Sequence, residues 1–278
     1  MSANEKKNTG VTWDPKNVFS GTAWFYARYR PDHPIEVINI LIEKFKLFNR
    51  SRVLDLGCGT GQITLQIAPY VSEVIAVDPQ EDMLNEGQKL ANTRGISNIR
   101  WIVGESGDLP RISGYINDID FTVIARAFHW MDREQTLKDL YKITKFDGGI
   151  AVIDDGGSRD GPMVPWKETI TQLRKKWLGE ERKAGTQGTY TPPTKRFETY
   201  LLESTFSDLE VAGFNIERIW TIDQIVGYTY SASASSIPIL GRNKEPFEAE
   251  LRARLKELDP TGQFREQVEV SVLMAWKR

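Results

Sequence analysis

Residues 53–61 constrain the fold of this chain more than any other stretch. They read Val-Leu-Asp-Leu-Gly-Cys-Gly-Thr-Gly, an apolar run followed by a turn that contains Gly57, Gly59 and Gly61. Glycine tolerates a positive φ and has no Cβ, so a ligand can lie directly against such a backbone. Residues 62–70 continue in a helical pattern, and the start of a helix offers free N–H groups. The stretch predicts a strand, a tight ligand-binding turn and a helix.

The glycine spacing and one carboxylate narrow the class of ligand. The fingerprint of dinucleotide-binding folds is G-x-G-x-x-G, and its helix faces a pyrophosphate. Here the spacing is G-x-G-x-G, and Asp55 precedes the first glycine by two positions. An extra carboxylate suits a positively charged ligand better than a phosphate. A nicotinamide-dependent oxidoreductase is therefore the less favoured alternative.

The amino-acid composition argues against several other classes of protein. The 278 residues include 40% hydrophobic and 27% charged side chains, and the formal net charge is −2. No overall basic field favours nucleic acid or membrane binding. The chain has one cysteine, Cys58, so no disulfide joins two of its own residues. No apolar stretch reaches the ~18 residues of a membrane span, and residues 1–10 are polar and lack the apolar core typical of a secretory signal. We expect a cytoplasmic protein.

Short apolar runs alternate with helical patterns after residue 52. The runs lie at 53–56, 74–77, 99–103, 121–125 and 150–153, and the helices between them at 62–70, 81–94 and 133–144. Such alternation indicates βαβ units and a parallel sheet covered on both faces. Further strands are expected at 214–220 and 268–276, after a helix over 197–212 capped by Gly213. Two more helices are expected at 223–236 and 246–258. The prediction is an α/β, Rossmann-like, doubly wound sheet of seven strands, mostly parallel, with the last strand antiparallel.

The turn after the second strand carries Asp78. A carboxylate at this position can accept hydrogen bonds from both hydroxyls of a ribose, as in dinucleotide folds. Aspartate is also a preferred N-cap of a helix, which is the alternative role. Met83, in the following helix, either packs on a base or belongs to the core.

These motifs resemble those of a known family. The Asp-x-Gly-x-Gly-x-Gly turn resembles motif I of class I S-adenosylmethionine-dependent methyltransferases. Residues 26–31, Tyr-Ala-Arg-Tyr-Arg-Pro, and residues 127–130, Ala-Phe-His-Trp, resemble segments of the type 11 small-molecule group, including members similar to trans-aconitate methyltransferase. The resemblance implies S-adenosylmethionine as cofactor, with Arg30 near its methionine carboxylate. It implies cofactor contacts from Tyr26, Arg30, Asp55, Gly57, Cys58, Gly59, Gly61, Asp78, Pro79, Met83, Glu105, Ser106, Ala125 and Ala127.

The sequence constrains the methyl acceptor less than it constrains the cofactor. His129 is either a general base or a structural residue that orients its loop. Trp130, Tyr228 and Ser231 are candidate acceptor contacts, although the hydroxyl-rich stretch 228–235 could equally be an exposed helical face. We expect a small-molecule methyl acceptor, with a carboxylate favoured over an apolar hydroxyl compound. If Arg30 binds the cofactor, Arg126 or a lysine must supply positive charge for the acceptor. A module that binds the cofactor without catalysis is a further alternative.

The expected organisation has four parts. Residues 1–34 form an N-terminal segment over the cofactor pocket, and 35–155 form the cofactor-binding core. Residues 156–196, rich in glycine and proline, form an inserted lid. Residues 197–278 return to the sheet with a helical excursion between its last two strands.

Overall fold

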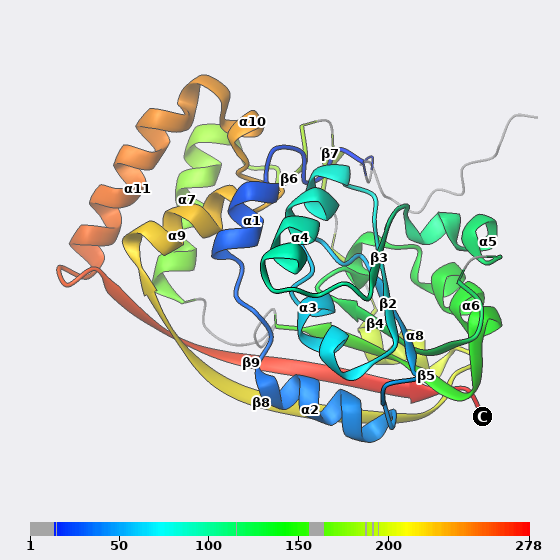
Figure 1. Ribbon diagram of the computed structural model, residues 1–278. Helices are drawn as coiled ribbons and strands as arrows, with labels where there is room; N and C mark the ends of the chain where they lie inside the picture. The colour runs from blue at the N-terminus through cyan, green and yellow to red at the C-terminus, as the bar shows by residue number, and fades with distance from the viewer. Residues whose placement is uncertain are drawn as a thin grey trace, which may run out of the picture.

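A seven-stranded sheet forms the centre of the molecule in a computed structural model (Figure 1). The structure describes residue 14 and residues 16–114, 116–155, 164–186, 188–190, 192–193 and 195–278. Residues 1–13 of the predicted N-terminal segment 1–34 and residues 156–163 of the predicted lid 156–196 therefore lie outside the described residues. Among the described helices, none is long and apolar enough to cross a membrane.

The strand order is β3-β2-β1-β4-β5-β9-β8. The strands are β1 (Arg52–Leu56), β2 (Glu73–Asp78), β3 (Ile99–Val103), β4 (Ile119–Ala125), β5 (Thr144–Asp154), β8 (Ser207–Thr221) and β9 (Gln263–Trp276). Strands β1 to β5 pair in parallel, whereas β9 is antiparallel to both β5 and β8. The predicted fold class is confirmed, including the antiparallel last strand.

Helices cover both faces of the sheet because the parallel strands are apolar on both sides. On one face α2 (Ile35–Lys44) and α3 (Thr64–Ile67) pack against β1, β4 and β9. On the other, α5 (Leu109–Ile112), α6 (Arg133–Ile143) and α8 (Phe197–Leu202) pack against β1, β2 and β4. Helix α4 (Glu81–Thr93) lies beside β2 and β3. Crossover connections of this kind leave the carboxyl ends of the strands open as a ligand site.

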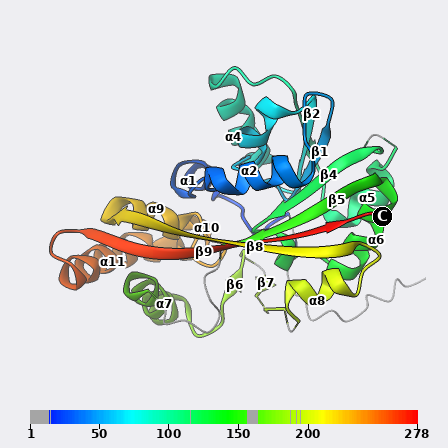
Figure 2. The same cartoon turned by 90° about the horizontal axis from the view of Figure 1, so that it is seen from below.

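A second layer of helices, which we call the cap, lies beyond the sheet (Figure 2). Strands β8 and β9 extend past the other strands as a two-stranded ribbon that reaches the cap. The cap consists of α7 (Pro165–Leu178), α9 (Ile222–Tyr230), α10 (Ile237–Leu240) and α11 (Lys244–Leu258). It has its own hydrophobic cluster, which includes Trp166, Trp220 and Phe247.

Helix α1 (Ala23–Tyr29) joins the cap to the half of the molecule that contains β1 to β5. A Cβ on Gly227 of α9 would lie 2.3 Å from the ring of Tyr29, so the two helices touch at this glycine. Helix α1 lies between α9 and α4 in Figure 1. The N-terminal segment therefore contacts both the cap and the sheet side of the molecule.

The helix predicted over 197–212 is wrong beyond Leu202. Strand β8 begins at Ser207, and Gly213 lies within it rather than at the end of a helix. Strand β8 pairs with β9 at Ser207 and then without interruption from Glu210 to Thr221, with an irregularity near Asp208, whose φ is 56°. These backbone hydrogen bonds override the helical pattern of the sequence. The helix predicted over 223–236 ends at Tyr230.

Candidate functional site

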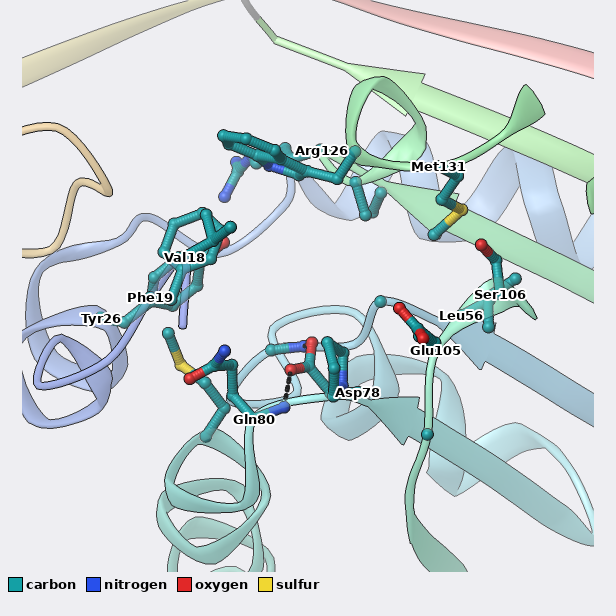
Figure 3. A pocket seen from close by; sticks show the side chains of 18 residues that line it. Val18, Phe19, Tyr26, Leu56, Asp78, Gln80, Glu105, Ser106, Arg126 and Met131 are labelled. Carbon is teal, nitrogen blue, oxygen red and sulfur yellow. Dashed lines mark hydrogen bonds between the residues drawn. The ribbon is translucent and has the colours of Figure 1, made fainter. Parts of the chain in front are cut away.

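The main pocket lies at the carboxyl ends of β1, β2 and β4, where the fold predicts a ligand (Figure 3). It encloses about 730 Å³ including its open mouth. Eleven residues that the sequence singled out line it: Tyr26, Gly57, Gly59, Asp78, Pro79, Met83, Glu105, Ser106, Ala125, Ala127 and Trp130. Residues from six separate turns and helices thus converge on one cavity.

The glycine turn has the backbone that its sequence predicts. Gly57, Gly59 and Gly61 have φ angles of 77°, 56° and 83°. A Cβ on Gly57 would lie 2.5 Å from the Cβ of Ala127, so the two turns approach too closely for any other residue. At Gly59 a Cβ would lie 3.4 Å from the Tyr26 ring, on the pocket side of the loop. Only glycine fits this conformation without strain.

Asp78 organises the loop as well as facing the pocket. Its Oδ2 accepts a hydrogen bond from the backbone N–H of Gly59 at 2.9 Å, and its Oδ1 accepts one from Gln80 at 2.9 Å. The N-cap of α4 is Gln80, so the N-cap alternative for Asp78 is not what the structure shows. Burial raises the pKa of this carboxyl to about 6. Each oxygen retains a second lone pair for a ligand hydroxyl.

A smaller cavity, which we call the inner cavity, continues from the main pocket. The two share Tyr26, Gly57, Ala125 and Arg126, and the inner cavity has a volume of about 260 Å³ when the space open to solvent is included. Its further lining residues are His33, Asp55, Cys58, Gln62 and Ile63. Two predicted cofactor residues, Asp55 and Cys58, therefore face this extension.

Asp55 and His33 each bring an unsatisfied polar atom to the inner cavity. Asp55 is 1% exposed and His33 is 4% exposed. Within the described part of the chain, Asp55 Oδ1 and His33 Nδ1 have no hydrogen-bond partner. Burial raises the pKa of Asp55 to about 7, although Thr64 donates a hydrogen bond to Oδ2. Buried polar groups of this kind are expected to have a partner, which here can be a ligand.

The thiol of Cys58 is unreactive in this environment. Burial raises the pKa of its thiol well above the ordinary value, so it stays protonated at neutral pH. A thiolate is the reactive form of cysteine. Its neighbours in the hydrophobic cluster are Ala76 and Leu84, so the side chain packs in the core.

Arg126 is a charged residue whose surroundings the sequence did not predict. It follows β4 with a φ of 55°, and it lines both the main pocket and the inner cavity. Its Nε and Nη2 donate to Asp155 Oδ1 and Oδ2 at 2.8 and 2.6 Å, and its Nη1 donates to the carbonyl of Pro31 at 2.9 Å. Arg218 of β8 donates to the same Asp155 at 3.1 Å. No spacing rule in the sequence joins these residues, because they come from three distant segments.

His129 and Trp130 belong to an aromatic wall beside the pocket. The ring of Trp130 lies 5.6 Å from Phe19 and 5.2 Å from Tyr190, centroid to centroid, and His129 lies 5.9 Å from Tyr190. Burial, together with the charges of Arg182, Arg133 and Arg30, lowers the pKa of His129 to about 3. The imidazole is therefore neutral at pH 7. Trp130 lines the main pocket and His129 does not.

The remaining predicted residues lie outside the two cavities. Arg30 Nε donates to Ser231 Oγ at 2.8 Å, and its guanidinium lies 4.4 Å from the centre of the Tyr228 ring. Ser231 is the C-cap of α9 and its hydroxyl donates to the carbonyl of Tyr228, so it satisfies the helix end. Gly61 faces Trp101 rather than the pocket. Arg30, Tyr228 and Ser231 thus form one group between α1 and the cap.

Comparison with known proteins agrees with this site. Residues 53–148 match a family model described as a methyltransferase domain. The Schizosaccharomyces pombe protein "Uncharacterized methyltransferase C25B8.09" is 28% identical over 250 residues, which cover 89% of this chain and 90% of that protein. The Saccharomyces cerevisiae protein "Probable S-adenosylmethionine-dependent methyltransferase CRG1" is 34% identical over 127 residues. That match spans 45% of this chain and 43% of the yeast protein, less than half the length of each.

Solved structures show the same fold. The YcgJ protein from Bacillus subtilis superimposes with a TM-score of 0.57 at 16% identity, covering 88% of this chain and 99% of that one. A phosphoethanolamine N-methyltransferase from Haemonchus contortus, solved with phosphomonomethylethanolamine and S-adenosylhomocysteine, has a TM-score of 0.51 at 14% identity. The match covers 94% of this chain and 56% of the nematode chain.

The pocket fits the cofactor that these relatives imply. The inner cavity offers an unpartnered carboxylate oxygen at Asp55, which suits an ammonium group, and glycines 57 and 59 let a ligand approach the backbone. Asp78 faces the main pocket, where a ribose would lie. The methyltransferase domain matched over residues 53–148, the relatives and the shared fold together support a class I S-adenosylmethionine-dependent methyltransferase with S-adenosylmethionine as its cofactor.

Proposed function

We propose that the protein methylates a small anionic acceptor, such as a carboxylate. The observation that carries the proposal is the set of three arginines, Arg30, Arg133 and Arg182, whose charges act together on His129. Within the described residues, none of the three forms an ion pair with a carboxylate. Uncompensated guanidinium groups beside the aromatic wall favour an anionic ligand, because arginine binds carboxylates through paired hydrogen bonds.

The arginines come from three different parts of the fold. Arg30 follows α1, Arg133 begins α6, and Arg182 lies after α7 in the cap. Arg182 stacks on Tyr190, with its guanidinium 4.3 Å from the ring centre. The cap also holds Arg174, whose Nη1 is buried without a hydrogen-bond partner in the described part of the chain. The acceptor would thus lie between the His129–Trp130 turn and the cap.

A carboxylate acceptor requires little acid–base chemistry. The cofactor supplies a methyl group bonded to a positively charged sulfur, which is a good leaving group. The chain's own residues then align the acceptor and exclude water, and alignment alone can contribute roughly 7–11 kcal/mol. Because the pKa of His129 is lowered to about 3, its imidazole is a poor general base. We propose that His129 positions the acceptor with Trp130 and Tyr190 instead of removing a proton.

A methyl-transfer screen tests the proposal. Each carboxylic acid is offered together with its neutral amide, and methyl incorporation from labelled cofactor is counted. We expect methylation of acids only, and Arg182→Gln should raise KM for them about tenfold or more, as loss of a charged hydrogen bond does. Arg50→Gln, an exposed change away from the pocket, serves as the matched control. Methylation of neutral phenols alone would refute the anionic acceptor, and cofactor binding with no transfer would indicate a non-catalytic module.

A further inference from the structure

The amino-acid end of S-adenosylmethionine carries both an ammonium and a carboxylate, and the two groups need different partners. The family resemblance places the carboxylate near Arg30. In this structure Arg30 lines neither cavity and is held by Ser231 and Tyr228 at the cap. A different cation is therefore needed at the inner cavity.

We propose that Arg126, together with His33, binds the methionine carboxylate of the cofactor in the inner cavity. Arg126 is the cationic side chain that lines both cavities, which share it at their junction. Asp55 lines the same inner cavity and offers its free Oδ1 to the ammonium. The inner cavity thus has one acidic and one basic wall, complementary to a zwitterion. The proposal rests on the cofactor and is independent of the acceptor.

The hydrogen bonds of Arg126 leave donors for a ligand. A guanidinium has five N–H groups, and three of those on Arg126 are used by Asp155 and Pro31. One N–H on Nη1 and one on Nη2 remain. These existing bonds fix the plane of the guanidinium, so an incoming carboxylate meets an oriented donor and little side-chain entropy is lost.

The charges of the Arg126–Asp155–Arg218 group also favour an anion beside Arg126. Arg126 and Arg218 share the single carboxylate of Asp155, and all three side chains are at most 15% exposed. Burial alone would raise the pKa of Asp155, but Arg126 and Arg218 hold it below its ordinary value, so the carboxyl is ionised. Within this group of three side chains, one positive charge is therefore not neutralised. A buried unpaired charge is costly, and a bound carboxylate would neutralise it.

His33 contributes a second, independent donor. Burial and the charge of Arg126 lower the pKa of His33 well below its ordinary value, so the ring is neutral. A neutral imidazole carries one proton, and on Nδ1 that proton would point at a hydrogen-bond acceptor in the inner cavity. Gln66 holds the His33 backbone through both its N–H and its carbonyl, which fixes the ring's position.

Decarboxylated S-adenosylmethionine lacks only this carboxylate. Comparing its binding with that of S-adenosylmethionine therefore distinguishes a direct contact between Arg126 and the carboxylate from a purely structural role of Arg126. Binding of both ligands is measured by calorimetry to wild type, Arg126→Gln and Arg30→Gln. For Arg126→Gln we expect the Kd of S-adenosylmethionine to rise on the order of 10- to 100-fold, and the Kd of the decarboxylated ligand to change less than threefold. Arg30→Gln should leave both values within threefold of wild type.

Two further variants guard against misfolding. Arg126→Gln with Asp155→Asn removes both charges of the Arg126–Asp155 pair and leaves an amide oxygen that can still accept the hydrogen bond from Arg218. His33→Asn tests the second donor, and both variants should show the same ligand discrimination. An equal loss of affinity for the two ligands in every variant would overturn the proposal, as would discrimination by Arg30→Gln. If wild type bound neither ligand, the cofactor assignment itself would fail, which is a different result.

Discussion

Proton-linked cofactor binding is the sharpest prediction from the inner cavity. The carboxyl of Asp55 has its pKa raised to about 7 by burial, and its Oδ1 has no partner in the described part of the structure. A bound ammonium favours the ionised form, so binding must lower this pKa. Below pH 7 the free protein holds a proton on Asp55 that has to leave before the cofactor binds. Affinity is therefore lost as the pH falls through 7.

The magnitude follows from linkage. If the bound pKa lies below 5, the Kd should rise on the order of 15-fold between pH 7.0 and 5.5, or about 1.6 kcal/mol. Asp78, whose pKa is about 6, adds a further few-fold if its ionised form binds the ribose. The range stops at pH 7 because the α-amino group of the free ligand begins to lose its own proton near pH 7.7–8.0.

Calorimetry in two buffers of different ionisation enthalpy measures both affinity and proton release. At pH 6 we expect about 0.9 proton released from Asp55 per cofactor bound. Asp55→Asn keeps an acceptor for Thr64 but cannot titrate, so its pH dependence should shrink to the part due to Asp78. A Kd that is constant from pH 5.5 to 7.0, or an equal slope in Asp55→Asn, would refute the reasoning.

Two further predictions concern the loop and the cap. Asp78→Ala should weaken cofactor binding by about 1.5–3 kcal/mol. Gly59→Val places a branched side chain at a φ of 56° beside Tyr26 and should weaken binding at least as much. Calorimetry tests both variants, and circular dichroism checks that each one is folded. Glu266→Ala leaves Trp220 Nε1 and Lys167 without their buried partner, so the free energy of unfolding should fall by about 1–3 kcal/mol. Denaturant unfolding followed by tryptophan fluorescence measures this change. Glu217→Ala removes an exposed carboxylate and should change the free energy of unfolding little.

Local patterns in the sequence were sufficient to predict the cofactor-binding half of the fold. Its strands are short apolar runs, and Gly57, Gly59 and Asp78 follow them at positions where the fold leaves the carboxyl ends open. Each of these signals depends on neighbours within a few residues, which is why spacing and residue type revealed them. The same holds for Glu105 and Ser106, which line the main pocket in the turn after β3.

The cap and the ion network depend on contacts that no local pattern shows. Strand β8 pairs with β9, about fifty residues later in the chain, so its first part was predicted as a helix. Arg126 meets Asp155 and Arg218 only after three strands have assembled. His33 has no signal beyond being a histidine before a proline, and its buried position comes from the packing of α2 and the glycine turn.

The separate hydrophobic cluster of the cap has a consequence for how this scaffold can diversify. The side chains that stabilise α7, α9 and α11 are not those that stabilise the sheet, and the two regions are connected mainly by the β8–β9 ribbon and by α1. We therefore expect that substitutions on the inner surface of the cap can alter which acceptor fits without disturbing the main pocket. A laboratory library confined to cap positions around Arg174 and Arg182 should explore new substrates while every member keeps its affinity for the cofactor.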